Sequence, residues 1–152
     1  MVGLRVSVIA AILLSTAGST TQPNTPVSDL RARVERKLGA APADCGQFFI
    51  TRLMRPSASR GELGKAIACV TDHAARRDPA WFVVQLQGID SWVARGLMVG
   101  RDGIVKQFSY DSDPSGGSSI EPGFTDETCR TPRVWDRDDR KEPTIDCEAR
   151  RD

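Results

Sequence analysis

Histidine is nearly absent from this chain, since His73 is the one histidine in 152 residues. A zinc site built on two histidines is therefore excluded, and any serine triad would have to use His73 as its base. The four cysteines contain no Cys-x-x-Cys pair, which is the close spacing of a zinc knuckle. We therefore expect neither a structural zinc site nor a cofactor.

The chain also lacks an excess of either charge, with 21 basic and 20 acidic residues. Proteins that bind nucleic acid or anionic membranes through electrostatics usually present a basic excess. We therefore predict no nucleic-acid partner and no anionic membrane surface as partner. A protein partner remains open.

The N-terminal apolar run, Val6 to Leu14, is too short to span a bilayer. It follows Arg5 and precedes the small residues Ser15, Thr16 and Ala17, so residues 1–17 have the three regions of a secretory signal peptide. No cysteine near this junction could accept a lipid, and we expect no membrane anchor after signal removal. The pattern predicts a secreted or periplasmic protein, with a flexible leader over 18–27 and a single domain over 28–152.

Four cysteines in an exported chain indicate two disulfides, because the compartment is oxidising and the number is even. Three pairings are possible, and we predict Cys45 with Cys69 and Cys129 with Cys147. The first bridge would tie the segment after Asp44 to a helix. The second would close a C-terminal hairpin that has few apolar residues of its own.

The strongest helical pattern follows Glu62. Its apolar residues recur at intervals of three and four, which places them on one face: Leu63, Ala66, Ile67, Val70 and Ala74. Ser59 is the expected N-cap, and Pro79 cannot continue the helix.

Three strands are predicted after this helix. They are residues 81–87, 91–99 and 104–110. Asp102-Gly103 is typical of a tight hairpin turn between the last two. Gly96, inside the second strand, indicates a bulge or a close backbone approach.

A shorter amphipathic helix is predicted from Ser28, with Leu30, Val34 and Leu38 on one stripe and Gly39 as its terminator. Its polar face carries four basic residues: Arg31, Arg33, Arg36 and Lys37. This face is either an anion-binding patch or an ordinary solvated helix surface.

The remaining segments are less regular. Residues 47–54 are apolar enough for a strand or a buried segment, and 111–123 has the Gly, Ser and Pro content of a long loop. Residues 133–135 and 144–147 are strand candidates for the C-terminal hairpin. The predicted fold is α+β: one main helix packed on a three- to five-stranded antiparallel sheet, a short N-terminal helix and two disulfides.

Asp111 opens a segment that resembles a calcium loop, with oxygen ligands at alternate positions and a glycine at the sixth. The candidate ligands are Asp111, Asp113, Ser115 and Glu121. The match fails further on, because Glu121 is eleventh and Pro122 occupies the place of the bidentate Glu. A loop whose Asp residues form turns is the alternative.

Trp81 and Trp92 lie in adjacent predicted strands and form a candidate binding face, because tryptophan combines a large contact area with a hydrogen-bond donor. The alternative is that both side chains belong to the core. His73 lies near the end of its helix, and we interpret it as a surface residue and not as a general base. Paired carboxylates such as Asp136 and Asp138 are common here, but a glycosidase needs two that face each other across a cleft.

Three short motifs give the chain a resemblance to small exported bacterial proteins of no assigned activity: Asp44-Cys45-Gly46, the helical segment 66–69, and Gly88-Ile89-Asp90-Ser91 before a strand. The resemblance implies a compact α+β domain with a helix on an antiparallel sheet, and it brings no catalytic residues with it.

We therefore expect a non-enzymatic binding or accessory module. The alternatives are a small hydrolase that uses carboxylates and a structural component of the cell envelope. An enzyme should have a concave pocket where carboxylates, His73 or a serine converge, whereas a binding module should have a flatter patch with exposed aromatic residues.

Overall fold

The computed structural model describes residues 26–50, 58–87, 91–116, 121–137 and 142–147. The elements in chain order are α1 (Pro26–Leu38), β1 (Ala43–Ile50), α2 (Arg60–Arg76), β2 (Ala80–Gln87), β3 (Trp92–Val99), β4 (Val105–Asp111), β5 (Gly123–Thr128), β6 (Pro132–Arg137) and β7 (Glu142–Cys147). The predicted signal peptide lies outside the described residues, and so does the leader except for its last two residues. These two residues begin α1, which starts at Pro26 and not at Ser28.

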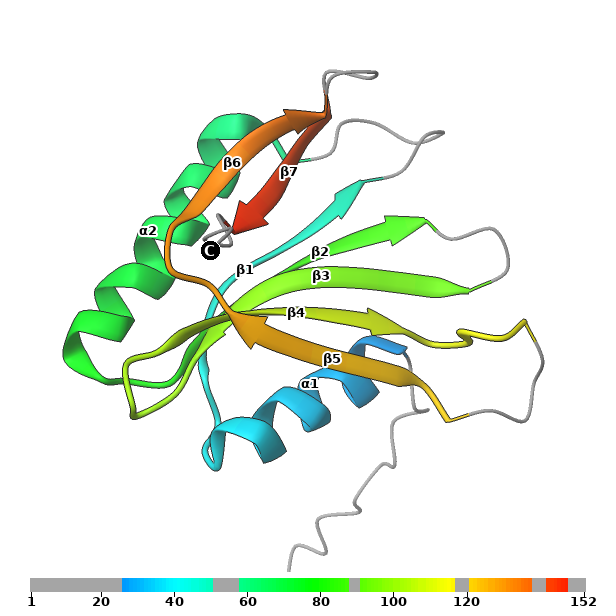
Figure 1. Ribbon diagram of the computed structural model, residues 1–152, viewed down its shortest axis with the longest axis horizontal. Coiled ribbons are helices and arrows are strands. Elements are labelled where there is room, and N and C mark those ends of the chain that lie inside the picture. Colours follow the sequence, from blue (N-terminus) through cyan, green and yellow to red (C-terminus); the bar gives the residue numbers. More distant parts are fainter. Residues whose placement is uncertain (1–25, 51–57, 88–90, 117–120, 138–141, 148–152) are drawn as a thin grey trace, which may run out of the picture.

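Five strands form one sheet in the order β1-β2-β3-β4-β5, and β6 pairs with β7 in a separate hairpin (Figure 1). The α+β class is confirmed, but the prediction of a wholly antiparallel sheet is wrong because β1 runs parallel to β2. The reason lies in the connection: β1 reaches β2 through α2, and a helical crossover returns the chain in the same direction. The sheet is therefore mixed.

The sequence signals at the ends of α2 act as predicted. Ser59 is the N-cap, and it forms a capping box in which its side chain accepts from the Glu62 backbone while the Glu62 carboxylate accepts from the Ser59 backbone. Arg77 closes the other end in the left-handed conformation. The predicted apolar face packs on the sheet, with Leu63, Ala66 and Val70 buried.

The two helices cover opposite faces of the sheet. On β2, Phe82 and Val84 face α2, whereas Trp81 and Val83 belong to a second cluster that includes Leu30 and Val34 of α1. In Figure 1, α2 and the β6–β7 hairpin lie on one side of the sheet and α1 lies on the other. The core therefore has two layers that share one central sheet.

Strand β5 was not predicted. It begins inside the segment expected to be a loop, and it pairs with β4 from Gly123 to Thr128. Most of its side chains are polar, so its apolar content gave no signal. Phe124 is the exception, and its ring stacks on Phe108 of β4 with 5.7 Å between centroids.

Both disulfides have the expected pairing, Cys45 with Cys69 and Cys129 with Cys147. Cys129 is 3% exposed, so the second bridge reaches the core and closes the hairpin predicted over residues 133–147. Two disulfides fit a protein that folds in an oxidising compartment. Neither helix among the described residues is long and apolar enough to cross a lipid bilayer.

Gly96 is a close-approach site, one of the two alternatives read from the sequence. The register of β3 with β2 is regular through Gly96, so no bulge occurs there. A Cβ atom on Gly96 would collide with the Phe82 carbonyl oxygen and lie 2.5 Å from the Phe108 ring. The missing side chain is what allows Phe108 to lie against the sheet.

Replacing Gly96 with alanine should therefore lower the free energy of unfolding by about 2–3 kcal/mol, since the collision involves backbone that cannot move alone. Gly64→Ala is the matched control, because this exposed position in α2 has no neighbour within 4 Å of an added Cβ. Alanine there should raise the free energy of unfolding by roughly 0.5–1 kcal/mol. Urea unfolding of the oxidised proteins measures both, and an unchanged midpoint for Gly96→Ala would contradict the packing described.

Candidate functional site

Trp81 is not a surface residue, which corrects part of the predicted binding face. Its side chain is fully buried between the sheet and α1, where its ring stacks on Phe108 at 6.3 Å between centroids. Trp92 is partly exposed, but its Nε1 donates to Gln85 Oε1 at 3.0 Å and its ring contacts Tyr110. The two residues therefore do not form one exposed face.

The most exposed tryptophan side chain is one that sequence reasoning did not select. Trp135 of β6 is 44% exposed, and the Arg133 guanidinium lies 5.0 Å from its ring centroid. Arg133 pairs across the hairpin with Asp146 at 3.1 Å. We call these three residues the hairpin patch. The alternation of side chains along a strand could have predicted this patch, because Val134 packs inward and its neighbours Arg133 and Trp135 must then point outward.

The hairpin patch lies on a rigid support. Cys129 and Cys147 join the two ends of the hairpin, and Val134 and Ile145 face each other across its inner side against α2. The strand that carries the patch is therefore held in place.

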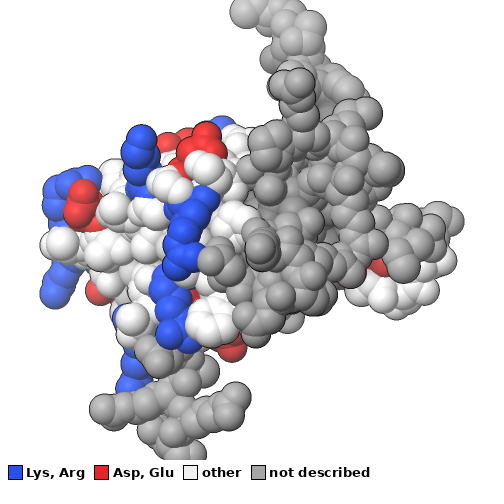
Figure 2. Space-filling view, turned by 90° about the horizontal axis from the view of Figure 1, so that it is seen from above, with Lys and Arg blue, Asp and Glu red and all other residues white. Residues whose placement is uncertain are grey.

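Figure 2 shows the molecule from the top of the view in Figure 1, which is the side of the layer that α2 and the β6–β7 hairpin form. A row of Lys and Arg side chains crosses the coloured part of this face, with acidic side chains near its ends. Charge of both signs is therefore present there.

The basic face of α1 is largely neutralised by ion pairs. Arg31 binds Glu35, Arg33 binds Asp29 at 2.8 Å, and Lys37 binds Asp126 at 2.6 Å. A recess of about 330 Å³ does lie beside Arg33, Arg36, Lys37 and Phe124. Because most of these cations already have acidic partners, the solvated-surface interpretation fits better than the anion-binding one.

Asp29 links α1 to the sheet. Its carboxylate accepts from Arg33 and from the Tyr110 hydroxyl, the latter at 2.9 Å. Burial alone would raise the pKa of Asp29, but these two hydrogen bonds and the charge of Arg33 lower it below its usual value. Burial and the hydrogen bond to Asp29 raise the pKa of Tyr110 to about 12.

Tyr110 is the one tyrosine in the chain, so ultraviolet absorption of tyrosinate reports this residue alone. We expect a midpoint near 12, against about 10 for a solvated tyrosine. A raised pKa means that this contribution to stability is complete below about pH 10 and is lost as pH rises toward 12. Asp29→Asn should lower the midpoint, because it removes the negative acceptor.

Asp126→Asn is the control for this titration. Asp126 also connects α1 to the sheet, through Lys37, but it does not contact Tyr110. It should leave the tyrosinate midpoint unchanged. Circular dichroism must show folded protein at each pH, and an ordinary midpoint in folded wild type would contradict the buried hydrogen bond.

The candidate calcium ligands begin at Asp111, the last residue of β4, and two of them belong to a turn. Asp111 Oδ1 accepts from the Asp113 backbone at 3.0 Å, which is the turn-forming role of Asp. Glu121 is mostly exposed and lies 3.7 Å from Arg33. Within the described residues, the acidic groups of this segment do not come together as a metal-binding cluster.

Calcium should therefore leave the melting temperature unchanged, within error, between added Ca²⁺ and added chelator. A ligand that binds the native state raises the melting temperature in proportion to its affinity. A calcium-dependent rise of several degrees that Asp111→Asn removes would show that this loop is a real site. The same rise in the Asp111→Asn protein would indicate calcium bound elsewhere.

His73 lies beside the first disulfide. Cys69 and His73 are four residues apart on α2, and a ring nitrogen of His73 and the sulfurs of Cys45 and Cys69 all lie within 4.8 Å of one another. His73 is half-buried, and its Nδ1 is buried without a hydrogen-bond partner. The prediction of a simple surface histidine is therefore incomplete.

Three recesses formed by described residues lie at the β3–β4 turn, along β4 and β5, and beside α1. None of these three combines the groups that hydrolysis needs, and His73 lines none of them. Asp126 and Glu127 line the second, but they are adjacent on a strand and their side chains point to opposite faces. Hydrogen bonds from Lys37 and Lys106 lower the pKa of Asp126 against the effect of burial, which opposes a general-acid role.

Comparison of the chain with protein-family models, with curated proteins and with solved structures found no match.

Proposed function

We propose that this protein is an exported, non-enzymatic binding module that contacts a protein partner through the hairpin patch of Arg133, Trp135 and Asp146. The observation that carries the proposal is the exposure of Trp135 beside the Arg133 guanidinium. Tryptophan and arginine are the residue types that most often dominate the energy of protein interfaces. The export part rests on the signal-like residues 1–17 and on the two disulfides.

The hairpin patch suits binding because little order has to be gained when a partner arrives. The Arg133–Asp146 pair and the stacking on Trp135 restrict these side chains before contact. The disulfide and the inward-facing Val134 hold the strand beneath them. A preorganised surface loses less conformational entropy on association than a mobile one.

Two other functions have less support. A hydrolase needs two groups of different acidity that face a common cavity, and the described recesses do not place such groups together. A structural component of the envelope needs no exposed tryptophan, so the effect of removing Trp135 separates it from a binding module.

The mature protein is immobilised and used to capture a partner from the exported proteins of its source. Trp135→Ala should abolish this capture. The captured protein is identified by mass spectrometry, purified and titrated calorimetrically, and loss of a dominant interface residue should weaken its binding about 30-fold or more. Ile104→Ala is the matched control, because Ile104 is an equally exposed apolar side chain at the β3–β4 turn. Equal binding by wild type and Trp135→Ala would contradict the proposal.

A further inference from the structure

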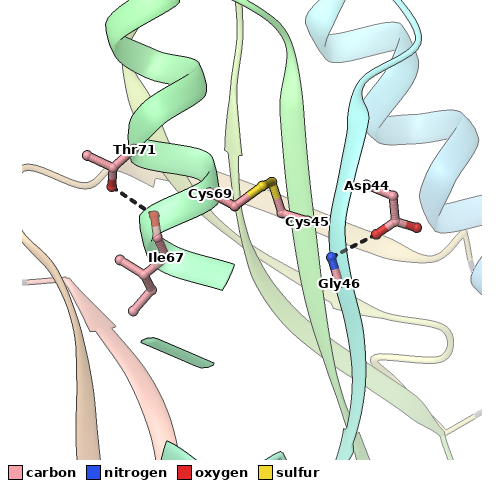
Figure 3. Close-up of a disulfide and its surroundings, with 6 residues drawn as sticks. All are labelled: Asp44, Cys45, Gly46, Ile67, Cys69 and Thr71. Atoms are coloured by element: carbon pink, nitrogen blue, oxygen red, sulfur yellow. Dashed lines mark hydrogen bonds between the residues drawn. A yellow bond between two sulfur atoms is a disulfide. The ribbon is translucent and has the colours of Figure 1, made fainter. Parts of the chain in front are cut away.

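Three metal-binding side chains meet where α2 lies over β1. Figure 3 shows the Cys45–Cys69 disulfide bridging the strand and the helix. His73 extends the group, since residues four apart on a helix share one face and its ring nitrogen lies within 4.8 Å of both sulfurs. In the disulfide the sulfurs are poor ligands, because a metal binds thiolate sulfur.

The unpartnered Nδ1 of His73 is an independent indication that this group has a use. Buried polar atoms in folded proteins nearly always have a hydrogen-bond partner, and an exception requires a reason. Nδ1 of His73 is buried without one, on a helix whose caps hold it in place. An imidazole nitrogen left free in this way is available to a metal ion.

We propose that Cys45, Cys69 and His73 form a latent metal site, which opens when the Cys45–Cys69 disulfide is reduced and then binds a thiolate-preferring cation such as Zn²⁺. Two thiolates and one imidazole are a ligand set that zinc accepts, with the fourth position left for water or another ligand. The site is independent of the hairpin patch, which lies on another element.

The chemistry is a two-electron exchange followed by metal binding. A dithiol reductant is oxidised to its disulfide, the Cys45–Cys69 bond breaks, and two protons pass to the cysteine sulfurs. The metal then replaces these protons, which are released to solvent. The disulfide and the metal site are therefore alternative states of the same two cysteines.

The geometry requires small movements. Zinc–ligand bond lengths and a tetrahedral angle place two sulfurs roughly 3.8 Å apart, and sulfur and nitrogen roughly 3.5 Å apart. The Cα atoms of Cys45 and Cys69 are 5.8 Å apart, and β1 has a register irregularity between Asp44 and Gln47. Cys45 lies within that irregularity, where no regular ladder fixes its position, so its sulfur can separate from that of Cys69 while α2 stays in place.

The experiment uses the full mature protein reduced with a phosphine, with Co²⁺ as the spectroscopic probe and Zn²⁺ as the competitor. Alkylation and mass spectrometry establish which cysteines are free. We expect one Co²⁺ per chain with a thiolate-to-cobalt charge-transfer band in the reduced protein, displacement by Zn²⁺, and no band in the oxidised protein. His73→Asn, which keeps the size of the side chain, should weaken binding at least tenfold.

Cys129→Ser/Cys147→Ser and Cys45→Ser/Cys69→Ser locate the site. The first double variant should keep the cobalt band and the second should lose it; if the first does not fold, wild type in which alkylation shows Cys129–Cys147 intact replaces it. The proposal is overturned if His73→Asn binds as tightly as wild type or if the band depends on Cys129 and Cys147. It is also overturned if reduction of Cys45–Cys69 removes the helical circular dichroism, since the site needs β1 and α2 in contact.

Discussion

Burial of β2 on both faces is the constraint on which the rest of this fold depends. Every side chain from Ala80 to Gln85 is buried, and alternation sends Trp81 and Val83 to one side and Phe82 and Val84 to the other. A strand of this kind is stable only between two covering layers. Helix α1 supplies one layer, and α2 with the β6–β7 hairpin supplies the other (Figure 1).

The sequence contained most of this arrangement in the segments where local signals agree. The α2 helix has an apolar period, Ser59 as its N-cap and Pro79 just after its end, and β2 to β4 have strand alternation and a tight turn. The direction of β1 was not predictable in the same way. Whether a strand joins its neighbour parallel or antiparallel is decided by the path of the crossover, which is a tertiary property.

The errors at individual residues have a related cause. Trp81 was read as a candidate surface residue because its size alone does not reveal that α1 covers it from a distant part of the sequence. Strand β5 was missed because β4 supplies its pairing, and Phe124 is its one large apolar side chain. Trp135 was not selected because it ends a short strand candidate that the charged segment 136–142 follows, although the inward position of Val134 predicts its exposure.

The two disulfides have different physical surroundings, and the two proposed sites differ accordingly. Cys129–Cys147 joins the ends of the hairpin at the edge of the core, so the rigidity of the hairpin patch depends on it. Cys45–Cys69 connects an edge strand to a helix that is held independently by its caps and by Leu63, Ala66 and Val70 in the core. Opening Cys129–Cys147 would release a hairpin with little apolar surface of its own. Opening Cys45–Cys69 would leave α2 packed on the sheet, because the buried face of the helix and not the bridge supplies most of its contacts.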